Sequence, residues 1–244
     1  MLKGIDNIER ESQEAAAIGS GDWINTLKIK DGDVALVRFV TDKDELIRAK
    51  FHSVKKVTPR GEFTVPVYCT FEDTGMCPNC ASGNAPYNTM NLWAYVYYIL
   101  HKSQNPNIQA GSNEGIWAQI KQGKSILYKE EINAFRLFRT KFGYQGRYRQ
   151  MFVDFAKEYG TLCDRDYSWS RVGATNKNTN YNLMPKKESQ FEVPQGTMSI
   201  TDLPNLGDVV CGKVRTFSQI KSNEVKESEE LLNSSSEDKD LELF

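Results

Sequence analysis

Apolar and polar residues alternate with a period of two over much of this chain, which predicts a fold built mainly from β-strands. Residues 23–30, 33–40 and 45–54 are three such segments, separated by short polar turns as in a strand meander. Residues 63–71 form a fourth, and Pro66 restricts it to a sheet edge or a strand start because proline has no N–H to donate.

The pattern changes in the middle of the chain. Residues 91–100 are a fifth predicted strand, long and unusually aromatic. Residues 125–143 place apolar side chains near helical spacing, and this predicts a helix with Phe135 and Phe138 in its core. A second, short helix is expected at 151–160.

Alternation resumes at 167–172 and 180–185, which are joined by a turn-rich segment and predict a β-hairpin. Together these segments make mainly β structure with a few helices. Four regions are expected: an N-terminal arm (1–20), a core (21–185) with a metal-binding subdomain at about 50–90, a segment of uncertain order (186–223) and a disordered acidic tail (224–244).

Composition and charge refine this picture. With 244 residues, 39% apolar and 26% charged, the chain has an ordinary globular composition. No apolar run is long enough to span a membrane and the first residues are polar, so we expect a cytoplasmic protein without membrane association, in the host cytoplasm if it comes from a phage. Residues 1–223 carry a net charge near +5, and residues 224–244 carry eight acidic residues against two lysines.

Three of the five cysteines lie close together, at Cys69, Cys77 and Cys80, with His52 upstream. A C-x-x-C turn lets two sulfurs bind one ion, and Gly, Pro and Asn around it argue against a thioredoxin-like redox motif. A Cys3His set predicts one structural Zn²⁺. His101 is the alternative fourth ligand, and Cys69 and His52 could instead be ordinary strand residues.

A catalytic zinc is not favoured, because the patterns of zinc hydrolases and deaminases are absent and the chain holds only two histidines. The scattered carboxylates likewise give no magnesium cluster. We therefore expect a binding protein and not an enzyme.

Cations and aromatic rings are interspersed on this scaffold, as in proteins that hold phosphates with Lys and Arg and stack bases on rings. The rings could equally belong to the core. The predicted DNA-binding residues are Lys55, Lys56, Arg60, Trp93, Tyr95, Tyr97, Lys121, Lys124, Arg139, Lys141, Tyr144, Arg147, Tyr148, Arg149, Trp169 and Arg171.

The acidic tail ends in leucines and a terminal phenylalanine. Such a tail can compete with phosphates for a basic groove, and its apolar end can dock on a partner protein. The predicted partner-binding residues are Asp238, Asp240, Leu241, Leu243 and Phe244.

In the order His52, Cys69, Cys77 and Cys80, in the 166–185 hairpin and in the acidic tail, the chain resembles the zinc-containing single-stranded DNA-binding proteins of tailed phages, such as the helix-destabilising protein of T-even phages. The resemblance implies a five-stranded OB-fold barrel with an inserted zinc subdomain. It also implies self-association on DNA through the N-terminal arm, and a tail that recruits replication and recombination proteins.

The sequence thus predicts a sequence-tolerant single-stranded DNA-binding protein of DNA replication, recombination and repair. The alternative is a zinc-ribbon transcription or RNA-binding factor, which would prefer RNA or duplex DNA. A metal-dependent nucleic-acid enzyme is the third and least favoured reading.

Overall fold

A computed structural model of the protein describes residues 23–58, 61–102, 117–122, 125–141, 147–173 and 179–217. The chain divides into two compact units, residues 25–202 and a smaller unit of residues 1–24 with 203–244, which we describe separately. The predicted N-terminal arm and acidic tail lie outside the described residues.

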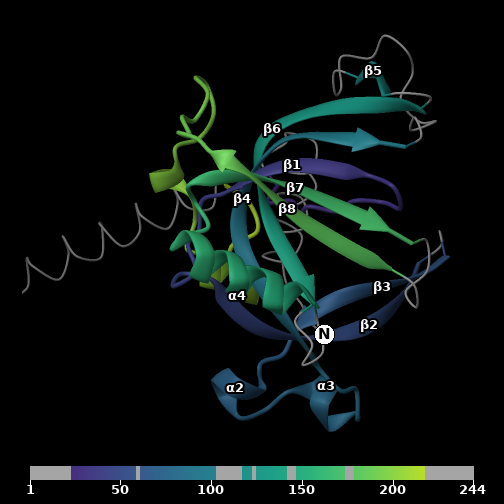
Figure 1. Ribbon diagram of the computed structural model, residues 1–244. Helices are drawn as coiled ribbons and strands as arrows, with labels where there is room; N and C mark the ends of the chain where they lie inside the picture. Colours follow the sequence, from purple (N-terminus) through teal and green to yellow (C-terminus); the bar gives the residue numbers. More distant parts are fainter. Residues whose placement is uncertain are drawn as a thin grey trace, which may run out of the picture. The chain divides into compact units, whose positions relative to one another are not determined.

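The larger unit is mainly β, as predicted, and the strands of the described residues belong to one antiparallel sheet (Figure 1). The strands are β1 (Val34–Phe39), β2 (Ile47–Thr58), β3 (Gly61–Tyr68), β4 (Tyr87–His101), β5 (Trp117–Gln122), β6 (Ser125–Lys141), β7 (Arg165–Val172) and β8 (Asn180–Glu188). The helices are α2 (Phe71–Thr74), α3 (Pro78–Ala81) and α4 (Arg147–Tyr159), with a 3-10 turn at Ile200–Asp202. The sheet order is β3-β2-β4-β1-β7-β8, and β6 pairs with β4 and β5.

Strand β4 organises this sheet. Along one edge, residues from Thr89 to His101 pair with β6. Along the other edge, its first half pairs with β2 and its second half with β1. Among the described residues the outer strands β3 and β8 do not pair with each other, so the sheet is open and a closed OB-fold barrel is not established.

The hydrophobic core lies on one face of the sheet, beneath α4. The ring of Phe39 on β1 packs against Phe138 of β6, Phe152 of α4 and Tyr167 of β7, with centroids 5.0–5.5 Å apart. Fully burying a side chain of this size contributes about 2–3 kcal/mol, so these rings are a large part of what fixes α4 on the sheet. The predicted helix at 151–160 is therefore confirmed, as the second part of α4.

The predicted helix at 125–143 is wrong, because this segment is strand β6. Phe135 pairs with Tyr95 and Phe138 with Leu92, and these pairs lie on opposite faces of the sheet. Asn133 adopts a positive φ of 44°, close to where the pairing register shifts between Val96 and Tyr98. This irregularity interrupts the alternation of period two, which explains why the apolar spacing imitated a helix.

Other strand predictions have mixed outcomes. The edge position of β3, which contains Pro66, and the β7–β8 hairpin are confirmed. Residues 23–30 do not form a regular strand; in the larger unit they contribute a single bridge, between Thr26 and Leu137 of β6.

The face of the sheet opposite the core holds a buried arginine. Arg38 of β1 is 1% exposed and donates hydrogen bonds to Asp166 (2.7 Å) and to the carbonyl oxygens of Cys163 and Ser189 (3.0 Å each). A buried charge needs such partners, because losing its hydration costs several kcal/mol. This network fixes the chain that follows β8 on the sheet.

Of the segment 186–223, residues 186–217 are described, and they include the end of β8 and a short helix. In the smaller unit, α5 (Leu206–Cys211) is capped by the Asn205 side chain, which accepts hydrogen bonds from the N–H groups of Gly207 and Asp208. Ile24 donates a backbone hydrogen bond to Arg215 in the same unit. No helix among the described residues is long and apolar enough to cross a membrane.

Candidate functional site

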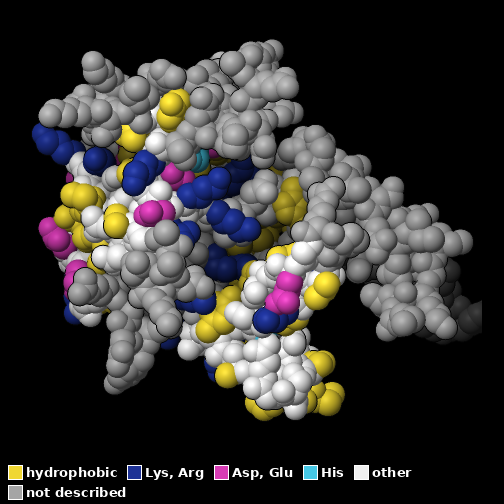
Figure 2. Space-filling view, turned by 90° about the vertical axis from the view of Figure 1, so that its right-hand side faces the viewer, with side chains coloured by type: hydrophobic (Ala, Val, Ile, Leu, Met, Phe, Trp, Pro, Cys, Tyr) yellow, Lys and Arg dark blue, Asp and Glu magenta, His cyan; other side chains and the backbone are white. Residues whose placement is uncertain are grey.

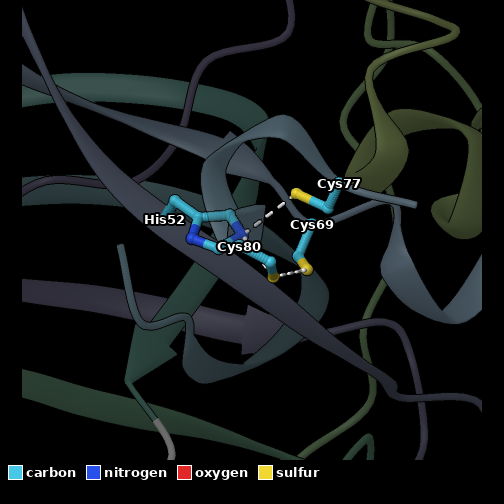
Figure 3. A group of neighbouring side chains, drawn as sticks. All are labelled: His52, Cys69, Cys77 and Cys80. Carbon is cyan, nitrogen blue, oxygen red and sulfur yellow. Dashed lines mark hydrogen bonds between the residues drawn. The ribbon is translucent and has the colours of Figure 1, made fainter. Parts of the chain in front are cut away.

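Four residues from a short part of the sequence come together at one end of the sheet. His52 lies on β2, Cys69 directly follows β3, Cys77 is the N-cap of α3 and Cys80 lies within α3. Figure 3 shows the three cysteine side chains and the His52 ring pointing toward one another. The structure thus assembles the predicted Cys3His set from a hairpin and the loop that follows it.

The spacing of the four side chains fits a tetrahedral metal ion. The His52 Nε2 atom lies 3.3 Å from the Cys77 sulfur and 3.5 Å from the Cys80 sulfur, and the sulfurs of Cys69 and Cys80 are 3.6 Å apart. All four ligand atoms lie within 4.8 Å of one another. Around zinc, metal–sulfur and metal–nitrogen bond lengths place neighbouring donors about 3.6–3.8 Å apart. The group could therefore hold one ion.

A backbone carbonyl orients the histidine. The Nδ1 atom of His52 lies 2.7 Å from the carbonyl oxygen of Asn84, so Nδ1–H donates and Nε2 keeps its lone pair toward the sulfurs. An outer hydrogen bond of this kind commonly fixes the tautomer of a metal-binding histidine. Because the ring is fully buried, Nδ1 needs a hydrogen-bond partner from the protein, and the Asn84 carbonyl oxygen provides it.

The turn from Cys77 to Cys80 favours the thiolate form of Cys77. The backbone N–H groups of Cys80 and Asn79 point at the Cys77 sulfur and lower the pKa of its thiol to about 6. At Cys80, burial and the neighbouring thiols act in the opposite direction and raise the pKa. Crowded thiols of this kind cannot all ionise without a cation between them, and a metal ion supplies that charge.

The group has the character of a structural site. His52, Cys69 and Cys77 are 0%, 3% and 6% exposed, and four protein ligands around one ion would complete a tetrahedron without an open position for substrate. Around it, the hydroxyl groups of Thr70 and Thr74 both donate to the carbonyl oxygen of Met76, which fixes the loop carrying Cys77.

His101, the alternative ligand, lies elsewhere. Its ring, at the end of β4, is held between Asp33 (3.0 Å), which directly precedes β1, and Glu130 (2.8 Å) within β6. Burial by itself would lower the pKa of His101, but the hydrogen bonds to the two carboxylates outweigh it and raise the pKa to about 9. The imidazole is therefore a cation at neutral pH, which is unsuited to metal binding.

A row of rings and cations lies on the sheet face opposite His52. The register pairs Phe51 with both Tyr68 and Tyr87, and pairs of this kind project to the same face. Thr89 and Asn91 lie two and four residues after Tyr87 on β4, so they share its face. They pair with Lys141 and Arg139 of β6, which therefore project to that face as well. We call the five residues Phe51, Tyr68, Tyr87, Arg139 and Lys141 the cation–ring strip.

Contacts within the cation–ring strip are close. The Arg139 guanidinium lies 4.2 Å from the centroid of the Phe51 ring, and the Lys141 ammonium lies 4.5 Å from that of Tyr87. The Phe51 centroid is 5.8 Å from Tyr68 and 6.4 Å from Tyr87. Figure 2 shows Lys and Arg side chains gathered on one face, with hydrophobic side chains beside them. The strip combines positive charge with partly exposed tyrosine rings.

The cations of the strip differ from other cations of the sheet in their partners. Lys50 pairs with Glu72 and Lys55 with Glu62. Within the described part of the chain, neither Arg139 nor Lys141 has a carboxylate within ion-pair distance; Arg139 donates to the neutral amide oxygen of Asn91 at 2.9 Å. Burial lowers the pKa of Arg139, so its charge is poorly hydrated, and no described carboxylate neutralises it. Such a group favours binding of an anion.

The predicted stacking platform on β4 and β7 is not exposed, and this is a correction. Tyr95, Trp93 and Trp169 are 0%, 4% and 5% exposed. The Phe191 ring, from the chain after β8, packs on Tyr95 and on the half-buried Tyr97. Trp169 lies on the core face, where it stacks on Tyr181 at 4.9 Å. These rings stabilise the fold in this structure and offer no free face to a base.

The remaining predicted DNA-binding residues are dispersed or undescribed. Arg171 donates to the carbonyl oxygen of Ile29, while Lys55 and Lys56 are exposed on β2. The side chains of Lys121, Arg147, Tyr148 and Arg149 are not described, and Arg60, Lys124, Tyr144, Asp238, Asp240, Leu241, Leu243 and Phe244 lie outside the described residues.

Sequence reasoning missed the three rings of the strip. Phe51 and Tyr68 each directly precede a metal ligand, so strand alternation places them on the face opposite the ligands; this signal was present in the sequence but was not used. Tyr87 could have been found by extending the alternation of the aromatic strand backwards from Trp93, because residues 93, 91, 89 and 87 share one face.

Comparisons with models of known protein families, with curated proteins and with solved structures find no match to this chain. The resemblance to phage single-stranded DNA-binding proteins therefore stays a prediction. The metal group and the cation–ring strip are the features of the molecule that bear on its function.

Proposed function

We propose that this protein binds single-stranded DNA without strong sequence preference and acts in DNA replication, recombination and repair, as a binding protein and not as an enzyme. In this proposal the sheet is an elaborated OB-fold and the metal is one structural Zn²⁺. The observation that carries the proposal is the cation–ring strip, whose cations have no carboxylate partner among the described residues.

The chemistry of the strip fits a flexible polyanion with flat bases. Arg139 and Lys141 supply charge for phosphates, and the Tyr68 and Tyr87 rings supply surfaces on which any base can stack. Since every base has a π-face, this recognition tolerates sequence. Duplex DNA hides its base faces, so we expect single strands to bind more tightly.

A metal bound on one face of β2 and β3 would stabilise the strip on their other face. His52 follows Phe51 on β2, and Cys69 follows Tyr68 at the end of β3, so alternation directs the ligands and the rings to opposite faces of the same two strands. Zinc bound to the ligands would fix the two strands at this point. The two rings would then be held in one geometry before DNA binds.

The acidic tail has a proposed role as well. We propose that Asp238, Asp240, Leu241, Leu243 and Phe244 recruit replication and recombination proteins, and that the protein self-associates on DNA. The tail lies outside the described residues.

A binding titration tests the proposal. Fluorescence anisotropy would compare labelled oligothymidylate, the corresponding RNA and a duplex of the same length at several salt concentrations. We expect the tightest binding to single-stranded DNA, with a steep loss of affinity as salt rises. Preference for RNA or duplex DNA would favour a zinc-ribbon transcription or RNA-binding factor, and absence of binding to all three would reject nucleic-acid binding.

A further inference from the structure

The hairpin of β2 and β3 extends past the rest of the sheet. Strand β4 pairs with β2 only from Ile47 to Phe51, whereas β2 and β3 remain paired as far as Thr58 and Gly61. We call residues 53–58 and 61–66 the β2–β3 ribbon; Figure 1 shows these two strands running on together, away from β4. Most of its described side chains are exposed.

A cation and a ring lie on the same face near the end of this ribbon. Lys56 pairs with Phe63 in the register, so the two side chains project from the same face of neighbouring strands. Phe63 is 45% exposed, and Lys56 is exposed and has no described carboxylate partner. The combination repeats that of Lys141 and Tyr87 in the strip, but both members are open to solvent.

We propose that Lys56 and Phe63 form a second contact for single-stranded nucleic acid, in which a base stacks on the Phe63 ring and a neighbouring phosphate meets the Lys56 ammonium. This inference rests on the proposed function and extends its binding surface. An exposed ring next to an unpaired cation suits a nucleotide, which offers both a flat base and an anion.

Lys56 and Phe63 project from the face opposite Phe51, and among the described strands none covers the way from the strip to this pair. Lys55 projects to the same face as Phe51 and is exposed, and its ion pair with Glu62 at 2.7 Å is a surface pair of little energy that a phosphate can replace. Beyond Phe51, no third described strand covers the edge of β2, so a bound strand can cross that edge to reach Lys56.

The distance along the ribbon predicts a dependence on DNA length. Lys56 is five residues beyond Phe51 on β2, which corresponds to about 16 Å along the strand. A short oligonucleotide on the strip would not reach so far, whereas a longer one would. Loss of the Phe63 ring should therefore weaken binding of long oligonucleotides only.

The test uses the full chain and oligothymidylates of about 3 and about 20 nucleotides. We expect Phe63→Ala to weaken binding of the long oligonucleotide about tenfold and to leave binding of the short one unchanged. Lys56→Ala removes one phosphate contact, so with the long oligonucleotide the slope of log affinity against log salt should fall by about 1. Met184→Ala, an exposed apolar residue of β8, is the matched control and should change neither affinity.

The outcomes separate this inference from the proposed function. If the wild-type protein binds and Phe63→Ala and Lys56→Ala equal it at both lengths, the ribbon contact is rejected and the function stands. A second outcome is that Phe63→Ala weakens binding of both oligonucleotides equally while metal content and thermal stability are unchanged. In that case Phe63 does not act only beyond the strip, and the inference is also overturned. A wild-type protein that binds neither oligonucleotide rejects both.

Discussion

The two faces of the β2–β3 strands are built in different ways. On one face, His52 and three cysteines come from a single hairpin and the loop after it, and each ligand atom lies against another. On the other face, the cation–ring strip takes residues from β2, β3, β4 and β6, brought together by strand register. A metal group of this kind can be recognised from local spacing, whereas the strip exists only in the folded sheet.

Losing a metal ligand should give the largest effect on stability. Cys77→Ser removes a buried sulfur, so the protein should lose its metal and on the order of 5 kcal/mol of stability, in the range expected for loss of a metal site. Elemental analysis and thermal unfolding would measure both. Cys211→Ser, outside the group, is the control and should keep the metal. Purified wild-type protein without bound metal would contradict the site.

Removing the strip arginine should give an intermediate effect. Arg139→Ala deletes the hydrogen bond to Asn91 and the contact with Phe51, so we expect about 2 kcal/mol less stability and about tenfold weaker binding of single-stranded DNA. Metal content should not change, because the ligands project to the other face. Calorimetry and anisotropy titrations would check this, and loss of the metal in this variant would show that the two faces are not separate.

The exposed lysine of the strip provides a cleaner test of binding alone. Lys141→Ala should change stability by no more than about 0.5 kcal/mol, but lower the slope of log affinity against log salt by about 1. Lys187→Ala removes the same charge from an exposed position on β8 and serves as the control. Equal salt slopes for the two variants would mean that position on the strip does not matter.

The second histidine tests which imidazole belongs to the metal group. The pKa of His101 is raised from 6.5 to about 9, so its pairs with Asp33 and Glu130 stabilise the fold fully below about pH 6.5. This contribution is lost as the pH rises through about 9. The wild-type protein should therefore exceed His101→Gln in melting temperature at pH 6 and approach it near pH 9.5, at equal metal content. A variant that loses metal would return His101 to the ligand set.

Some of this structure was predictable from the chain because the signals are local. His52, Cys69, Cys77 and Cys80 carry their own spacing, and the β7–β8 hairpin has two alternating segments around a turn. The edge position of β3 follows from the missing N–H of Pro66.

The errors arose where distant partners decide the structure. Pairing with β4 makes 125–141 a strand although its apolar spacing is irregular. Alternation placed Tyr95 on an aromatic face, but could not show that Phe191, nearly a hundred residues later, covers that face. For the same reason Phe51 and Tyr87 were not linked to Arg139 before the register was known.

We propose that the strip binds single-stranded DNA by stacking as well as by charge. The affinity of Tyr87→Leu for oligothymidylate, measured beside the wild-type protein and Tyr87→Trp at matched metal content, tests this directly. We expect about tenfold weaker binding for Tyr87→Leu and retained binding for Tyr87→Trp. Equal affinity of all three proteins would contradict it, because the ring would then contribute nothing to binding.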